Sequence, residues 1–319
     1  MREKAILVVQ IDGKLPNLAL EKVKKFYRDK GYKIYENFPL AVPYVERIFV
    51  SCIFTWNRRK AEVWRQYPHA EIGGSGVDLT KNLPPEIEAV KPKINLGFTT
   101  RGCIRKCPFC IVPKKEGYIR TVGDIYDVWD GKSDKITLLD NNILGLREHF
   151  FKIIKQLKKE RLKVDFNQGL DCRLVDEEVA KALSEVRHEE YKFAFDFVGV
   201  EPYVIRTINL LRKHGIRRCT WYVLVGFNTS YEEDLYRLFL LRRLGQNAYV
   251  QRYNYWDNPK VQNKFYIAMA RWANQHHIYQ GMTFSHFLRK ARYIENPQIR
   301  DLFGKILKLE REVFGRHMI

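Results

Sequence analysis

Three cysteines stand close together in residues 102–110, which read GCIRKCPFC. Cys103, Cys107 and Cys110 are spaced C-x3-C-x2-C. A structural zinc site is closed by four ligands, and a cubane iron–sulfur cluster usually takes four cysteines. Three cysteines on one short loop can hold three irons of such a cluster and leave the fourth iron open to a non-protein ligand. Because an open coordination position is where metal sites react, we expect chemistry at this loop.

The other three cysteines are scattered at Cys52, Cys172 and Cys219, which is no disulfide framework. They are most simply interpreted as buried thiols that behave as small apolar residues. Cys172 has an alternative role, because it follows a predicted strand. It could supply a fourth ligand and close the metal site.

The composition indicates a folded chain that meets polyanions. The 319 residues are 45% hydrophobic, enough for two domains or for a barrel with an extension. No run approaches ~18 apolar residues, and the apolar run at residues 5–9 is too short for a signal sequence. We therefore expect a cytoplasmic protein without a membrane span. The net charge of +19 favours a nucleic-acid partner, although lysine-rich solvated helices would give the same excess.

Residues 1–91 are predicted to form a small α/β domain. Strand-like runs alternate with amphipathic helices, which favours a parallel sheet. Asn17 is a predicted helix N-cap and Gly31 a glycine that ends the same helix. The expected strands are 5–9, 32–35, 47–53 and 70–72, and the expected helices are 17–30 and 58–67. The last strand runs into the glycine-rich turn 73–76, and prolines near residue 91 mark the boundary.

Residues 92–255 contain six further strand-like runs, most of them followed by a helical pattern. The strands are expected at 93–98, 135–139, 163–166, 191–195, 219–225 and 248–253, and the helices at 122–129, 146–160, 176–186, 203–214 and 232–244. Six such units predict an open, partial (β/α)6 TIM-like barrel. Reactive groups of barrels lie on loops after the strands, and the three cysteines follow the first strand.

Residues 256–319 are predicted to be a helical extension rich in aromatic and basic residues. The aromatic residues could stack on unpaired bases beside phosphate contacts. We favour the alternative, in which they pack as a helical core with the basic residues outside. The aromatic residues concerned are Trp256, Phe265, Tyr266, Trp272, Tyr279, Phe284 and Phe287.

At the cysteine loop the chain resembles the radical S-adenosylmethionine (radical SAM) superfamily. The superfamily signature is C-x3-C-x2-C with an aromatic residue before the last cysteine, here Phe109. The resemblance implies that Cys103, Cys107 and Cys110 ligate a 4Fe-4S cluster whose open iron binds S-adenosylmethionine. It also implies reductive cleavage of that cofactor, a 5′-deoxyadenosyl radical that abstracts hydrogen, and an electron donor such as flavodoxin or ferredoxin.

The resemblance also implies a cofactor pocket on later strand ends. After the second barrel strand, Asp140 and Asn141 occupy the place of a glycine-rich acidic turn that holds the methionine amine, but the glycines are missing. After the third strand, Gln168, Asp171 and Arg173 suit the ribose and carboxylate, since a guanidinium forks onto a carboxylate. Gly226, after the fifth strand, resembles the glycine of a turn that packs the adenine.

The first domain resembles the Rossmann-like cobalamin-binding domain of one radical SAM subclass. Residues 73–76 resemble its cofactor-facing glycine loop, but its cobalt-ligand histidine is absent, because the matching place, residues 12–17, reads DGKLPN. We favour a scaffold domain, with cobalamin held without a protein ligand as the alternative. Cys52 stands alone, whereas methylthiotransferases have three cysteines in this domain, which argues against a second cluster.

Charge suggests the substrate class. The cysteine loop is ringed by cations with one acidic residue, Glu116, among them, which favours a nucleic acid such as a tRNA. These cations are Arg101, Arg105, Lys106, Lys114, Lys115 and Arg120. One or two of them could instead bind the cofactor carboxylate, and a peptide or small-molecule substrate stays open. The rival function is a non-catalytic zinc or iron–sulfur protein that binds nucleic acid and closes its metal site with Cys172.

Overall fold

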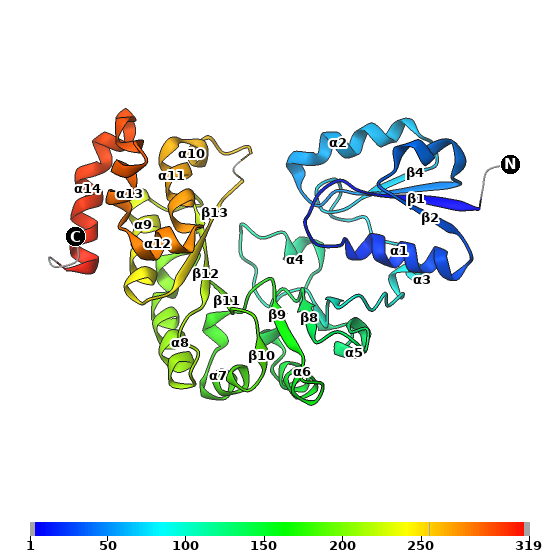
Figure 1. Ribbon diagram of the computed structural model, residues 1–319, viewed down its shortest axis with the longest axis horizontal. Helices are drawn as coiled ribbons and strands as arrows, with labels where there is room; N and C mark the ends of the chain where they lie inside the picture. Colours follow the sequence, from blue (N-terminus) through cyan, green and yellow to red (C-terminus); the bar gives the residue numbers. More distant parts are fainter. Residues whose placement is uncertain (1–3, 255, 316–319) are drawn as a thin grey trace. The chain divides into compact units, whose positions relative to one another are not determined.

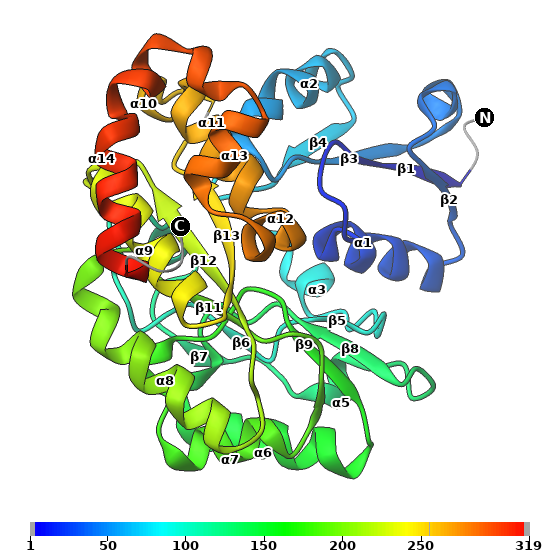
Figure 2. The same cartoon turned by 60° about the vertical axis from the view of Figure 1, so that its left-hand side comes forward.

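The computed structural model describes residues 4–254 and 256–315. These residues form two compact units, the first ending at Leu139 and the second beginning at Asp140 (Figures 1 and 2). Both units combine helices with strands, and every described strand pair is parallel except the pairing of Thr100–Arg101 with Arg120–Thr121 in unit one. The predicted α/β class is therefore confirmed.

A four-stranded parallel sheet forms the first part of unit one. Its strands lie in the order β2-β1-β3-β4, so the chain crosses from one side of β1 to the other after β2. The strands are β1 (Ala5–Gln10), β2 (Lys33–Glu36), β3 (Arg47–Ser51) and β4 (Ala70–Gly73). All four were expected within one or two residues, because their apolar runs are bounded by turn residues.

Apolar side chains from both faces of this sheet are buried, which gives three layers. On one face Ile6, Val8 and Phe49 pack against Leu20 and Val23 of α1 (Leu18–Asp29). The other face packs under η1 (Pro39–Tyr44), α2 (Arg58–Glu62) and η3 (Val63–Gln66). The predicted N-cap is confirmed, since the Asn17 side chain accepts hydrogen bonds from the backbone of residues 19 and 20.

The rest of unit one carries the cysteine loop. After α3 (Pro85–Glu88), the short strand β5 (Leu96–Gly97) pairs in parallel with β8 (Lys135–Leu138), and α5 (Ile125–Val128) lies between them in the sequence. The segment after β5 makes a hairpin of β6 (Thr100–Arg101) and β7 (Arg120–Thr121), with α4 (Val112–Lys115) inside its loop. This hairpin was not expected.

Unit two continues the alternation of strands and helices. Strand β9 (Lys163–Phe166) pairs in parallel with β10 (Arg187–His188), and β11 (Lys192–Ala194), β12 (Thr220–Val225) and β13 (Asn247–Arg252) form a parallel sheet. The helices between them are α6 (Arg147–Lys159), α7 (Glu177–Ser184), α8 (Glu201–Lys213) and α9 (Tyr231–Arg243). Short 3-10 turns are η4 (Ile143–Gly145), η5 (Cys172–Leu174) and η6 (Val198–Val200).

Capping residues set where two of these helices begin. The Asp176 side chain accepts from the backbone amide of Val179 at the start of α7. Ser230 and Glu233 form the expected reciprocal capping box at the start of α9. The four helices match the predicted ranges because their caps and apolar spacing are local features of the sequence.

The C-terminal segment is helical, as expected, and its aromatic residues form a core. The helices are α10 (Pro259–Gln262), α11 (Lys264–Ala273), α12 (His276–Gly281), α13 (Phe284–Lys290), η7 (Tyr293–Glu295) and α14 (Pro297–Phe314). Six of the seven aromatic residues considered for base stacking are buried, and only Trp256 is 36% exposed. Among the described residues, no helix combines the length and the apolar character that a membrane span needs.

A buried ion pair ties α9 to two strands of unit two. Arg237 and Asp234 are fully buried and paired with each other. The same guanidinium donates to the carbonyl of Phe195 at 2.5 Å and to that of Leu224 at 2.8 Å. Because the Arg237 donors reach carbonyls at the ends of β11 and β12, this side chain fixes the helix to the sheet.

We expect Arg237→Met to destabilise the protein by about 3–5 kcal/mol, because Asp234 would keep a buried charge without its partner. Urea unfolding followed by circular dichroism measures the loss. Arg212→Met is the matched control, since Arg212 is exposed on α8 and its loss should cost about 0.5 kcal/mol or less. Equal stabilities of the two variants would contradict the assignment.

Candidate functional site

The three clustered cysteines lie in the loop of the β6–β7 hairpin. Residues Thr100 and Arg101 pair with Thr121 and Arg120, so both ends of the loop are held together. Gly102 has φ +83°, and a Cβ there would lie 2.4 Å from the carbonyl oxygen of Tyr118. Only glycine fits this close approach at a left-handed backbone position. The glycine before the first cysteine therefore closes the hairpin.

Backbone amides organise the cysteines within this loop. The amide of Cys103 donates to the carbonyl of Gly117 at 3.2 Å, and that of Cys110 donates to the carbonyl of Cys107 at 3.0 Å. The amide of Arg105 donates to Sγ of Cys103 at 3.3 Å. The three cysteines are half-buried. Amide hydrogen bonds to sulfur stabilise a thiolate and tune an iron–sulfur cluster, so this loop fits such a cluster.

Glu116 fixes the base of the hairpin. Its side chain is 8% exposed, pairs with Arg101 at 3.1 Å and accepts from the backbone amide of Gly102 at 2.9 Å. The Arg101 guanidinium also lies 4.2 Å from the centre of the Phe98 ring. The acidic residue among the rim cations thus has a structural role, and it neutralises one of them.

The remaining rim cations differ in exposure. Lys106, Lys114 and Arg120 are exposed, whereas Arg105 and Lys115 are half-buried. Nζ of Lys115 donates to Oγ of Ser75 in the glycine-rich turn after β4. Burial, together with the nearby Arg101 charge, lowers the pKa of Lys115. This lysine connects α4 of the cysteine hairpin to the loops at the carboxyl end of the first sheet.

In unit two, polar side chains gather after β9. Arg173 forks onto Asp171, with Nε donating to Oδ1 at 2.7 Å and Nη2 to Oδ2 at 3.1 Å. Nδ2 of Asn142 donates to Asp171 at 3.4 Å. Asp140 is 4% exposed and Asn141 is half-buried beside it in the chain. The carboxylate that Arg173 holds is therefore that of Asp171, and a cofactor carboxylate would have to share or replace it.

Two other predicted site residues have different surroundings. Gln168 is exposed in the turn after β9. Gly226 is buried with φ +80°, and a Cβ there would lie 2.1 Å from Cγ1 of Val261 on α10. Its amide donates to Asp234 at 3.2 Å. The close approach of Val261 explains why glycine stands at this position, whether or not the turn also packs an adenine.

Asp196 is a candidate site residue that the sequence analysis missed. It follows β11 and is half-buried, and burial raises the pKa of its carboxyl to about 6, against the opposing charges of Arg237 and Arg173. A carboxyl held at such a cost is typical of a functional position. The available signal was an isolated aspartate between the apolar residues Phe195 and Phe197 at a predicted strand end.

The scattered cysteines are buried thiols, as predicted. Burial raises the pKa of Cys52 to about 11 and those of Cys172 and Cys219 to about 12. Sγ of Cys172 donates to the carbonyl of Ala194 at 3.8 Å. Metal ligation needs a thiolate, so these surroundings disfavour Cys172 as a fourth ligand. Nor are three or more His, Cys, Asp or Glu side chains placed around a single ion anywhere in the described chain.

The loop where the cobalt-ligand histidine is absent has a structural role. The Asp12 carboxylate accepts from the amides of Ile53 at 2.7 Å and Phe54 at 3.0 Å. A Cβ at Gly74 or at Gly76 would come within 2.6 Å of the backbone of residues 52–54. The glycine-rich turn therefore packs on the loop after β3, and these contacts account for its glycines.

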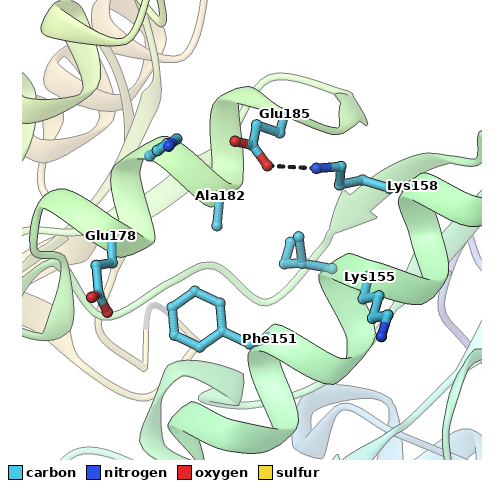
Figure 3. Close-up of a pocket in the computed structure, with 8 residues that line it drawn as sticks. Phe151, Lys155, Lys158, Glu178, Ala182 and Glu185 are labelled. Carbon is cyan, nitrogen blue, oxygen red and sulfur yellow. Dashed lines mark hydrogen bonds and ion pairs between the residues drawn. The ribbon is translucent and has the colours of Figure 1, made fainter.

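A separate groove lies between α6 and α7 (Figure 3). Its volume is about 470 Å³. Two of its lining residues, Lys158 and Glu185, form an ion pair in which Nζ and Oε2 are 2.6 Å apart. The floor is apolar, with Phe151 and Ala182 among its residues. No predicted site residue lines this groove.

The comparisons with known proteins rest on structure. No family model and no curated protein matches the chain. The solved structure of TsrM from Kitasatospora setae, a radical S-adenosylmethionine methyltransferase with cobalamin and a [4Fe-4S] cluster bound, matches with a TM-score of 0.59. The match has 12% identity and covers 78% of this chain and 75% of that one. The chain has the fold of a radical SAM enzyme.

A variant of spore photoproduct lyase with bound AdoMet and dinucleoside spore photoproduct also matches, at a TM-score of 0.36 and 11% identity. That match covers 79% of this chain and 78% of the lyase. The radical SAM fold rests on the TsrM comparison, which extends over three quarters of each chain.

We expect Asp196 to make the protein less stable as pH rises. The pKa of the folded state, about 6, exceeds the ordinary value, so the folded state keeps its proton where the unfolded state has lost it. The free energy of unfolding should therefore fall by about 2–3 kcal/mol as the pH rises from 4 to above 6, where Asp196 has lost its proton in the folded state as well. Urea unfolding of the unmodified protein and Asp196→Asn at pH 4 and pH 7 measures this. An unchanged pH slope in Asp196→Asn would contradict it.

We expect Gly226→Ala to destabilise the protein by about 2–4 kcal/mol, from left-handed strain and from contact with Val261. Adding Val261→Ala should recover the contact part of the loss. Gly215→Ala is the control for strain alone, because Gly215 has φ +85° and no atom within 4 Å of the added Cβ. Thermal unfolding compares the variants. Similar losses at residues 226 and 215 would show that Val261 does not matter.

Proposed function

We propose that the chain is a radical SAM enzyme whose 4Fe-4S cluster is held by Cys103, Cys107 and Cys110. The observation behind the proposal is the hairpin, whose single loop contains three half-buried cysteines, in a chain with the fold of a radical SAM enzyme. In a cubane cluster each cysteine binds a different iron. Three thiols on one loop suit this arrangement better than a single ion with four ligands.

When bound, such a cluster with S-adenosylmethionine supplies reductive cleavage of the cofactor and a 5′-deoxyadenosyl radical. The chain's own residues hold and shield this chemistry. The Arg105 amide stabilises the Cys103 thiolate, and Glu116 keeps the base of the loop closed. Phe109, which stands between the second and third cysteines in the sequence, is half-buried and adds an apolar side chain to the loop. Excluding water and stray hydrogen donors is the protein's main contribution to radical chemistry.

The proposed S-adenosylmethionine pocket draws on the polar strand ends. We assign Asp140 and Asn141 to the methionine amine, Asp171 and Arg173 to the carboxylate and ribose, and Gly226 to the adenine turn. We also assign Gln168, in the exposed turn after β9, to the ribose and carboxylate of the cofactor. Asp196 joins this set, because Arg173 and Asp171 both influence the pKa of its carboxyl. The ion pair of Arg173 with Asp171 preorganises the fork that an incoming carboxylate would meet.

The proposed domains are residues 1–91, a Rossmann-like unit, 92–255, a partial (β/α)6 barrel, and 256–319, a helical extension. TsrM carries cobalamin, whereas here the Asp12 carboxylate and the glycine-rich turn are engaged by the loop after β3. This supports a scaffold role for the first domain over cobalamin binding. We propose cytoplasmic flavodoxin or ferredoxin as the electron donor.

For the substrate we favour a nucleic acid, such as a tRNA, over a peptide or small molecule. The charge of +19 and the exposed Lys106, Lys114 and Arg120 on the hairpin support it. The rival, a non-catalytic metal protein closed by Cys172, is disfavoured because that thiol is buried, hydrogen-bonded and hard to ionise.

We expect single replacements Cys103→Ala, Cys107→Ala and Cys110→Ala to abolish both cluster binding and cofactor cleavage, since each removes one iron ligand. The reconstituted anaerobic protein should hold about four irons per chain. With dithionite and S-adenosylmethionine it should release 5′-deoxyadenosine, measured by chromatography.

Cys219→Ala is the matched control, because Cys219 is a buried thiol in unit two and should leave iron content and product unchanged. Deoxyadenosine from the Cys107→Ala protein would contradict the ligand assignment. One tightly held zinc and no nucleoside product from the unmodified protein would favour the rival function.

A further inference from the structure

The carboxyl ends of β1 and β3 are neighbours at an edge of the first sheet that the proposed chemistry does not use. The sheet order β2-β1-β3-β4 reverses between these two strands, and in open parallel sheets ligands bind at such a point. Two loops border it, residues 11–17 after β1 and residues 52–57 after β3. Both belong to unit one.

Two exposed aromatic rings stand on the second of these loops. Phe54 and Trp56 stack on one another, with ring centres 4.5 Å apart and planes 12° from parallel. Each is 38% exposed, and the neighbouring Ile53 is 36% exposed. A stacked and exposed aromatic pair offers flat apolar surface, which suits a planar ligand.

Hydrogen bonds and close packing hold the backbone that carries this pair. Asp12 accepts from the amides of Ile53 and Phe54 and from Nδ2 of Asn57, the last at 3.2 Å. On the other side, a Cβ at Gly76 would lie 2.6 Å from the backbone of Phe54. Because these contacts fix the backbone that carries the rings, less entropy is lost when a ligand binds than on an unsupported loop.

Basic residues flank the aromatic pair. Trp56 lies in η2 (Thr55–Asn57), and Arg58, Arg59 and Lys60 follow in the first turn of α2, where all three are exposed. Arg58 pairs with Glu62 at 3.3 Å. Lys14, on the facing loop, is exposed too. Aromatic rings beside cations are the combination that binds single-stranded nucleic acids, with bases on the rings and phosphates on the cations.

A hydrogen bond links this edge of the sheet to the cysteine hairpin. Ser75 lies between Gly74 and Gly76, which pack on the aromatic loop, and it accepts a hydrogen bond from Lys115 of α4. The aromatic loop, the glycine-rich turn and the hairpin are thus in contact within unit one.

We propose that Phe54 and Trp56 form a stacking platform for unpaired bases of an RNA substrate, with Arg59 and Lys60 contacting its phosphates. This inference rests on the proposed function and assigns its substrate class to the first domain. It also gives that domain a binding role, whereas the sequence favoured a scaffold, with cobalamin binding as the alternative.

Binding of a fluorescein-labelled single-stranded RNA dodecamer of mixed sequence tests the proposal by fluorescence anisotropy on the full-length reconstituted protein. Trp56→Ala and Phe54→Ala should each weaken binding about tenfold or more, and Trp56→Phe should retain most of it. The double variant Arg59→Gln/Lys60→Gln should reduce the slope of log K against log salt by about 1.4, for two phosphates.

Tyr203→Ala is the matched control, because Tyr203 is 41% exposed and lies 5.2 Å from the Arg206 guanidinium, yet stands on α8 of unit two. It should bind the RNA as the unmodified protein does. All variants should release 5′-deoxyadenosine from S-adenosylmethionine without RNA, so a failed platform is distinguishable from a failed enzyme assignment.

Three results would overturn the platform. The first is unchanged RNA affinity in both Phe54→Ala and Trp56→Ala. The second is an equal loss in Tyr203→Ala. The third is binding of hydroxocobalamin that Trp56→Ala abolishes while RNA affinity stays the same, because the aromatic pair would then serve a corrin.

Discussion

The geometry of the cysteine loop depends on one carboxylate, that of Glu116. It is nearly buried, so its charge must be satisfied locally, and it is satisfied by a guanidinium before the loop and by the amide that precedes the first cysteine. The same residue therefore sets where the loop begins and where it ends. Asp12 does this for the loop after β3, with two amides and one side-chain amide as donors. In both loops, one carboxylate that accepts hydrogen bonds from backbone amides fixes the local conformation.

The polar residues of unit two show a different constraint. The charges of Arg237, Arg173 and Asp171 all act on the pKa of Asp196, and Arg237 and Asp234 have no exposed surface. Such an arrangement costs desolvation energy that apolar residues would not cost. Asp171, Arg173 and Asp196 stand after strands β9 and β11, where we propose the pocket for the charged cofactor. The wholly buried Arg237 donates hydrogen bonds to carbonyls at the ends of β11 and β12. The half-buried Arg173 pairs with Asp171, and it is the residue that we propose for the cofactor carboxylate.

Much of the fold could be predicted because its signals are local. Asn17, Asp176 and Ser230 cap helices through residues two or three positions away, and strand β9 alternates polar residues with the buried Val164 and Phe166. The hairpin around the cysteines could not be predicted, because its strands have two residues each and their pairing depends on Gly102 meeting Tyr118. The contact of Asp12 with the loop after β3 spans some forty residues, and the charge that opposes the raised pKa of Asp196 comes from Arg237 on a later helix, so neither leaves a local pattern.

The burial of Cys52, Cys172 and Cys219 has a consequence for the chemistry of sulfur in this chain. With pKa values raised to about 11 or 12, these thiols stay protonated at neutral pH. Iron, oxidants and alkylating reagents all react with the thiolate form. The chain thus separates its six cysteine sulfurs into three buried thiols and three half-buried ones on a single loop. For the cluster that we propose on this loop, the buried thiols are poor competitors for iron.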